Sequence, residues 1–308
     1  MGLRLIIGRS GSGKTRLCLD EINKKQNNGQ RLIYIVPEQY SLQAERELVN
    51  VTGGILSAVV LSFRRLAENI FSECGVSSDK QLTDMGKLMI LRRILMQNRD
   101  KFKYFGVVCD RQGFADRISQ SLTELFSGGI TSEDLRDYAQ NFDKESSLYN
   151  KLNDMALIYS RYSEFVKKEY ITVDDILTVA SEKMEKANYI KNAEVWLDGF
   201  YGFTYQEFQI ISRLLASCSR VNITLNMDGE SASSSHLTME NGFYEPWDTM
   251  QRLKRICTES GYNVEKPVYL DKIYRFKTEG MKYVESEYLG YGVKQALKNI
   301  SMQISKTA

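Results

Sequence analysis

One octapeptide near the start of the chain constrains the fold more than any other stretch. It reads Gly8-Arg9-Ser10-Gly11-Ser12-Gly13-Lys14-Thr15. The spacing G-x-x-x-x-G-K-T puts glycines where the backbone must turn tightly, so that successive N–H groups can converge on an anion at a helix N-terminus. Lys14 can reach the β- and γ-phosphates, and the Thr15 hydroxyl can hold a magnesium ion that bridges them. The octapeptide therefore predicts a site for ATP and Mg²⁺; the alternative is a Gly/Ser turn that binds nothing.

Alternating strand and helix patterns surround the octapeptide. The expected strands cover 3–7, 31–36 and 55–61, and the expected helices cover 16–22, 41–49 and 63–73. Ser41 and Ser62 stand where helix N-caps are needed. Strands that alternate with helices form a parallel sheet with right-handed crossovers. The pattern predicts an α/β fold of the P-loop NTPase class, a parallel sheet flanked by helices.

The middle of the chain changes character, because residues 79–191 carry apolar side chains at helical spacing with hardly a strand candidate. Strands return at 194–198, 221–225 and 268–270, with helices at 204–215 and 247–257 and a flexible Ser-rich loop at 229–235. The tail, 276–304, is expected to be helical with breaks at Gly280 and at Gly290-Tyr291-Gly292. We therefore expect a P-loop domain formed by 1–78 and 192–308, with 79–191 as an inserted all-helical subdomain.

Composition indicates an ordinary globular protein of 308 residues, with 43 % hydrophobic and 26 % charged residues. We expect no membrane span, because no apolar run approaches 18 residues. The first strand begins at once, which leaves no room for a leader, so we expect a cytoplasmic protein. The five cysteines are scattered, with no C-x-x-C pair, which indicates reduced thiols. A net charge of +2 restricts any nucleic-acid contact to a local basic surface.

A phosphate-binding loop needs an acidic residue at the end of a neighbouring strand to hold magnesium. Asp198 ends a strand and is the best candidate, although it could be a plain turn residue. Its rivals are Asp110, interpreted as a helix cap, and Asp228. The carboxylate that orients the attacking water usually comes next in sequence, where this chain has Gly199. We expect slow or absent ATP hydrolysis unless Glu207 or Glu38 reaches the site.

The octapeptide and several further motifs follow one another in an order that resembles the B subunit of bacterial ATP-dependent helicase/nucleases of the AddAB (RexAB) type. They are the octapeptide, Val36-Pro37-Glu38-Gln39 with Gln43-Ala44-Glu45, Ser62-Phe63-Arg64-Arg65-Leu66-Ala67, Leu148-Tyr149-Asn150-Lys151-Leu152 with Leu157-Ile158-Tyr159, Val195-Trp196-Leu197-Asp198-Gly199-Phe200, Phe203-Thr204-Tyr205-Gln206-Glu207 and Arg275-Phe276. Apart from the octapeptide no single motif is specific, but their order is.

The resemblance implies a first motor domain like that of superfamily 1 helicases, in a subunit that helps to process double-strand DNA ends for recombinational repair. It implies a heterodimer with an active A subunit, and contact with double-strand ends and single-stranded DNA. The family's iron–sulfur cluster belongs to a C-terminal nuclease domain, so we expect this chain to be the N-terminal part of a longer subunit. By this resemblance active helicases have a γ-phosphate-sensing glutamine, which the strand that ends at Asn226-Met227-Asp228 lacks. We expect no unwinding by this chain alone.

DNA contacts are expected on the loops that follow the second and third strands. The candidates are Gln39, Tyr40, Ser62, Arg64 and Arg65. Each has a structural alternative: a packed tyrosine, a helix cap, or a solvated arginine face. Two other functions stay open. A nucleotide kinase would share the phosphate loop, although no arginine cluster marks its lid, and a non-enzymatic module could scan DNA and dock a partner.

Overall fold

The computed structural model describes residues 2–26, 29–54, 58–76, 81–169, 171–172, 176–278, 280–281 and 285. The chain forms two compact units. The first, here called the sheet unit, comprises Met1–Leu66, Ala187–Phe203 and Ile211–Ala308. The second, the helical unit, comprises Ala67–Lys186 and Thr204–Ile210. Among the described residues, no helix combines the length and apolar character that a membrane span requires.

The sheet unit is built on a seven-stranded parallel sheet with the order β3-β2-β6-β7-β1-β8, in which β9 also pairs with β1. Its strands are β1 (Gly2–Gly8), β2 (Leu32–Ile35), β3 (Ala58–Leu61), β6 (Glu194–Leu197), β7 (Arg220–Leu225), β8 (Asn263–Val264) and β9 (Val268–Leu270). The central strands are buried and mostly apolar, as expected for a parallel sheet covered on both faces. The predicted α/β fold, a parallel sheet flanked by helices, is confirmed.

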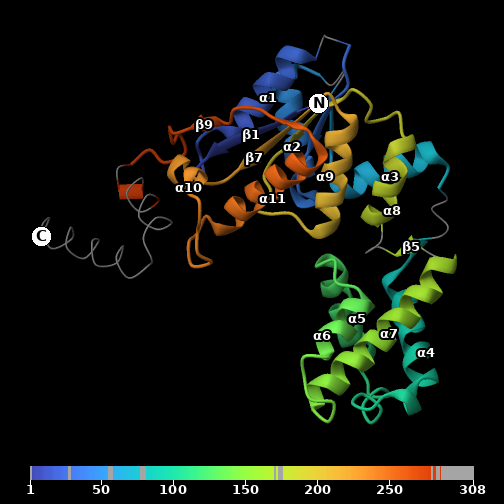
Figure 1. The fold of residues 1–308 in the computed structure, drawn as a ribbon. Coiled ribbons are helices and arrows are strands. Elements are labelled where there is room, and N and C mark those ends of the chain that lie inside the picture. The colour runs from blue at the N-terminus through green and yellow to red at the C-terminus, as the bar shows by residue number, and fades with distance from the viewer. Residues whose placement is uncertain are drawn as a thin grey trace, which may run out of the picture. The chain divides into compact units, whose positions relative to one another are not determined.

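Helices connect the strands of the sheet unit (Figure 1). They are α1 (Lys14–Lys25), α2 (Ser41–Thr52), the start of α3 (Phe63–Cys74), the end of α9 (Tyr205–Ser217), α10 (Gly229–Ser233) and α11 (Tyr244–Ser260), with the short 3₁₀ helix η1 (Glu38–Tyr40) before α2. Right-handed crossovers place α1 and α2 on one face, and α9 and α11 on the other, because the two pairs cross the sheet in opposite directions. Under α1 and α2 lies an apolar core that includes Leu19, Ile22, Leu48 and Trp196.

The helical unit has its own core, formed by helices that pack on one another. Its elements are the end of α3, β4 (Gln81–Leu82), α4 (Asp84–Gln97), η3 (Arg99–Lys101), α5 (Phe114–Ser127), α6 (Ser132–Ala139), α7 (Ser147–Glu169), β5 (Ile171–Thr172), α8 (Ile176–Lys183), η4 (Met184–Lys186) and the start of α9. Leu91, Leu95, Leu122 and Tyr162 are among its buried core residues. The short parallel pair β4-β5 was not expected from the sequence, because two-residue strands leave no alternating pattern.

Local predictions in the sheet unit had mixed outcomes. Ser62 does cap α3, since its Oγ accepts the Arg65 N–H at 3.2 Å. The prediction for Ser41 was wrong: η1 runs directly into α2, so Tyr40 occupies the N-cap and the Ser41 hydroxyl donates to the Glu38 carbonyl at 2.7 Å. The expected strand 55–61 is described only as Ala58–Leu61, because 55–57 lie outside the described residues.

Two further local predictions, for the Ser-rich loop and for Asp110 as a helix cap, were also wrong. The Ser-rich segment contains the helical turn α10, whose N-cap Asp228 accepts the Ser231 N–H at 2.7 Å. Asp110 caps no helix: α5 begins after Gly113, and Asp110 pairs with Arg99 at 3.3 Å instead. Most of the helix expected over 276–304 falls outside the described residues.

Candidate nucleotide-binding site

The octapeptide forms a tight loop between β1 and α1. Gly11 and Gly13 have φ of 77° and 92°, the left-handed region that glycine enters without steric cost. A Cβ on Gly8 would lie 2.4 Å from Ser12 Oγ and 2.8 Å from the Leu270 carbonyl oxygen, so only glycine fits there. Ser12 is buried, and its Oγ has no hydrogen-bond partner among the described residues. The loop therefore wraps closely over the N-terminus of α1.

Lys14 folds back over this loop. Its ammonium donates to the carbonyl oxygens of Gly8 at 2.6 Å and Arg9 at 2.9 Å, and to Asn226 Oδ1 at 3.3 Å. Burial lowers the pKa of Lys14 to about 8, while the negative charge of Asp198 opposes the shift. Lys14 thus carries a proton that is less firmly held than that of a surface lysine.

Asp198 ends β6 and meets the loop from the other side. It is 4 % exposed and accepts three hydroxyl donors: Thr15 Oγ1 at 2.6 Å and Tyr34 Oη at 2.8 Å bind its Oδ2, and Thr224 Oγ1 binds its Oδ1 at 2.6 Å. Burial and the charge of Asp198 raise the pKa of Tyr34, so the phenol stays protonated and donates. Asp198 and Thr15, the two residues expected to hold magnesium, therefore contact each other.

A cavity of about 810 Å³ opens beside these residues. Its volume lies in the range of small-molecule sites. It is lined by Ser10, Gly11, Gly13, Lys14, Thr15, Arg16, Leu19, Glu47, Asn50, Val51, Asp198, Gly199, Phe200, Tyr201, Thr224, Asn226, Tyr274 and Arg275. The rivals Asp110 and Asp228 are not among these residues, and neither are Glu38 and Glu207. Glu207 instead accepts the N–H and the hydroxyl of Thr204, as a cap at the start of α9.

A segment after β9, residues 271–275 and here called the strap, crosses the loop. The Tyr274 N–H donates to the Gly11 carbonyl at 2.8 Å, and the Arg275 guanidinium donates to Ser10 Oγ at 3.1 Å. In the sequence, Arg275 is noted only as part of the family motif Arg275-Phe276, without a role at the loop. Arg9 points elsewhere, since it pairs with Glu285 at 2.8 Å and with Asp228 at 3.7 Å. The cations that face the cavity therefore come from α1 and the strap, not from Arg9.

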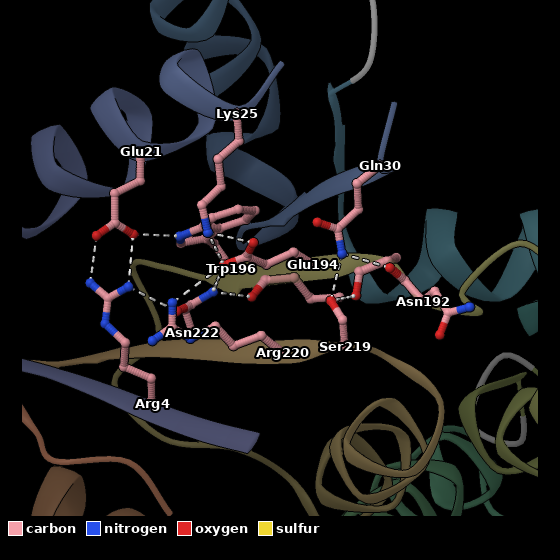
Figure 2. A network of polar contacts seen from close by, with 12 residues as sticks. Arg4, Glu21, Lys25, Gln30, Asn192, Glu194, Trp196, Ser219, Arg220 and Asn222 are labelled. Carbon is pink, nitrogen blue, oxygen red and sulfur yellow. Dashed lines mark hydrogen bonds and ion pairs between the residues drawn. The ribbon is translucent and has the colours of Figure 1, made fainter. Parts of the chain in front are cut away.

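Helix α1 is anchored to the sheet by a polar network at its C-terminal half (Figure 2). The Arg4 guanidinium of β1 donates to both carboxylate oxygens of Glu21, at 3.0 and 2.5 Å, and Trp196 Nε1 donates to the same carboxylate at 3.2 Å. The Lys25 ammonium donates to Glu194 at 2.6 Å. Strands β1 and β6 thus hold the helix whose N-terminus carries the loop.

The candidate DNA contacts lie on η1 and at the start of α3, after the neighbouring strands β2 and β3. Gln39 and Tyr40 are exposed. Arg64 is exposed, and Arg65, half exposed, pairs with Glu45 at 2.8 Å. Ser62 is 3 % exposed and acts as a helix cap, which fits its structural alternative. The exposed members therefore follow two neighbouring strands at the carboxyl edge of the sheet.

The chain is similar to known proteins over most of its length. Residues 5–285 match the family model described as "ADDB, N-terminal". Relatives described as the B subunit of an ATP-dependent helicase/deoxyribonuclease occur in Caldanaerobacter subterraneus (38 % identity; 88 % of this chain, 24 % of the relative), Thermoanaerobacter sp. (36 %; 98 % and 27 %) and Clostridium novyi (36 %; 96 % and 26 %). The chain spans about a quarter of the length of these relatives.

Proposed function

Because the chain belongs to the AddB family through its N-terminal region, we propose that it is the nucleotide-binding part of the B subunit of a helicase/deoxyribonuclease that acts on DNA ends. The observation that carries this proposal is the convergence of Lys14, Thr15 and Asp198 on one cavity. Glycine-rich backbone, a lysine and a hydroxyl–carboxylate pair are the groups that hold a nucleoside triphosphate and its magnesium.

Each group has a distinct role in this proposal. The loop N–H groups and Lys14 would bind phosphate oxygens at the start of α1. The Arg275 guanidinium, held beside Ser10, would add a second positive charge on the strap side. Thr15 and Asp198 would hold Mg²⁺, which neutralises phosphate charge when bound. The hydrogen bond between Thr15 and Asp198 fixes both oxygens before the ion arrives.

The same geometry supports binding with little turnover. Gly199 follows Asp198 and lines the cavity without a side chain that could orient water. Glu38 and Glu207, the two alternatives considered from the sequence, do not line it. Hydrolysis needs a group that positions or deprotonates the attacking water. We therefore propose a site in which ATP and Mg²⁺ act chiefly as bound ligands.

Family membership and the relatives' descriptions support a proposal for the wider role. We propose that the sheet unit is a motor-like domain that works beside an A subunit, and that the surface of η1 and α3 touches single-stranded DNA backbone. Arg64 and Arg65 would then bind phosphates, so affinity should fall steeply as salt is raised. Processing of double-strand ends for recombinational repair in the cytoplasm is the corresponding cellular task.

Nucleotide binding by the whole chain tests the proposal. A fluorescent ATP analogue with Mg²⁺ should bind the wild-type protein, and Lys14→Ala should weaken binding at least tenfold because a charge-assisted phosphate contact is lost. The matched control is Lys24→Ala, an exposed lysine on the same helix that does not line the cavity. Equal affinity of Lys14→Ala and the wild type would refute the proposed site.

A further inference from the structure

Two walls of the cavity come from facing helices. Thr15, Arg16 and Leu19 belong to α1, while Glu47, Asn50 and Val51 belong to α2. Positions 47, 50 and 51 share one helix face because they are three and four residues apart. Glu45 lies on another face of α2 and pairs with Arg65. The cavity therefore continues from the phosphate loop into the space between α1 and α2.

Glu47 and Asp198 are the carboxylates among the residues that line this cavity. Asp198 already accepts three hydroxyl hydrogen bonds. Glu47 Oε1 accepts the Gln43 amide at 2.8 Å, and in the described part of the chain no lysine or arginine forms an ion pair with Glu47. Its negative charge is one of those that raise the pKa of Tyr34, the phenol that donates to Asp198. Glu47, Thr15 and Asp198 thus line one and the same cavity.

A carboxylate without a basic partner is unfavourable in a site for polyphosphate, because like charges repel across the short distances of a cavity. A divalent cation reverses the sign of that interaction. Mg²⁺ dehydrates reluctantly and keeps several waters, and it is typically held by one or two carboxylates together with the substrate phosphates. The pair formed by Asp198 and Glu47 meets that requirement.

We propose that Glu47 is a second magnesium-positioning carboxylate, which accepts hydrogen bonds from the waters of the ion held by Thr15 and Asp198. This inference rests on the proposed nucleotide site. Glu47 supplies a negative charge from α2, a helix that is not part of the phosphate-loop motif. Glu47 would act on the metal shell and would leave the phosphate contacts of Lys14 untouched.

The test is the magnesium dependence of nucleotide affinity in the whole chain. A non-hydrolysable ATP analogue is titrated with excess Mg²⁺ and, separately, with EDTA. In Glu47→Gln the gain from Mg²⁺ should fall about tenfold, the lower end of what loss of an outer-shell partner costs. Affinity in EDTA should stay the same or rise, because a repulsive charge is removed. A loss of affinity that is confined to the Mg²⁺ titration distinguishes a metal-positioning role from general damage to the site.

Glu45→Gln is the matched control, since it makes the same change on the same helix away from the cavity, and it should leave both affinities unchanged. Glu47→Asp, which keeps the charge, should recover part of the Mg²⁺ gain. An unchanged gain in Glu47→Gln, or an equal loss in Glu45→Gln, would overturn the role of Glu47 alone. If the wild-type protein binds no nucleotide, the proposed function is overturned instead. If the wild-type protein binds the ATP analogue equally well with Mg²⁺ and with EDTA, the proposed metal site is overturned.

Discussion

Arg4 and Glu21 are joined by two parallel hydrogen bonds, in which both terminal nitrogens of the guanidinium donate to the two carboxylate oxygens. The pair links β1, which enters the phosphate loop, to α1, which leaves it. A bidentate pair fixes orientation as well as distance. The strand and the helix on either side of the loop are thereby held together by two residues that do not line the cavity.

Glu21→Gln should destabilise the protein by about 2–3 kcal/mol, since it leaves the buried Arg4 without its counter-charge. We place the value below the ~3–5 kcal/mol typical of fully buried pairs, because the Glu21 side chain keeps 20 % exposure. Asp20→Asn is the control: its pair with Arg16 is exposed, so the change should be under about 0.5 kcal/mol. Urea denaturation at pH 7 measures both.

The effect of Glu21 should also depend on pH. Burial alone would raise the pKa of Glu21, but hydrogen bonds from Arg4 and Trp196 outweigh it and bring the pKa below the ordinary 4.5. A carboxyl with a depressed folded pKa stabilises fully above its unfolded pKa, and that stabilisation disappears as pH falls through the folded pKa. The gap between the wild type and Glu21→Gln should therefore shrink below pH 4.5. A gap that stays constant with pH would contradict this account.

Nucleotide affinity should respond to alkaline pH through Lys14, whose pKa of about 8 lies well below the ordinary 10.5. As pH rises from 7 to 9 the free protein loses this positive charge, while bound phosphates favour the charged form. Affinity should therefore fall, by at most about tenfold per pH unit for a single linked proton. Calorimetry at pH 8 in two buffers of different ionisation enthalpy should show proton uptake on binding. Equal heats in both buffers would contradict the prediction.

Local patterns predicted the fold of the sheet unit well, for physical reasons. Buried parallel strands are continuous apolar runs, and the glycines of the loop occur where positive φ or close approach allows no side chain. Asp198 was expected beside the loop because it ends such a strand, and it does contact Thr15. The Ser41 prediction failed because a cap depends on the preceding residues, and η1 extends the helical path to Tyr40.

Other parts of the candidate site leave no local signal. Glu47 lies in the middle of an amphipathic helix, where a glutamate ordinarily indicates a solvated face. It lines the cavity only because α2 packs beside α1. Tyr274 and Arg275 come from irregular chain far from the loop in sequence, and no periodicity links them to it. Such residues follow from tertiary packing, and a single sequence does not encode them in a readable pattern.

The position of the strap should depend on the absence of a side chain at Gly11. An added Cβ at Gly11 would lie 2.4 Å from Arg275 Cβ, so Gly11→Ala should displace the strap. Gly261 is the matched control: its φ is 70°, and an added Cβ meets nothing within 4 Å. Both variants carry the left-handed cost of about 1–2 kcal/mol, while Gly11→Ala adds about 1–3 kcal/mol of steric strain or releases the strap to avoid it.

Limited trypsin digestion separates these outcomes, because Lys272 and Arg275 are cleavage sites within the strap. Cleavage there should be several-fold faster in Gly11→Ala than in Gly261→Ala under conditions where both stay folded. A released strap would also remove Arg275 from Ser10, so nucleotide affinity should fall in Gly11→Ala alone. Equal digestion rates with equal thermal stability would show that the strap does not depend on the glycine, and that its contacts with the loop are incidental.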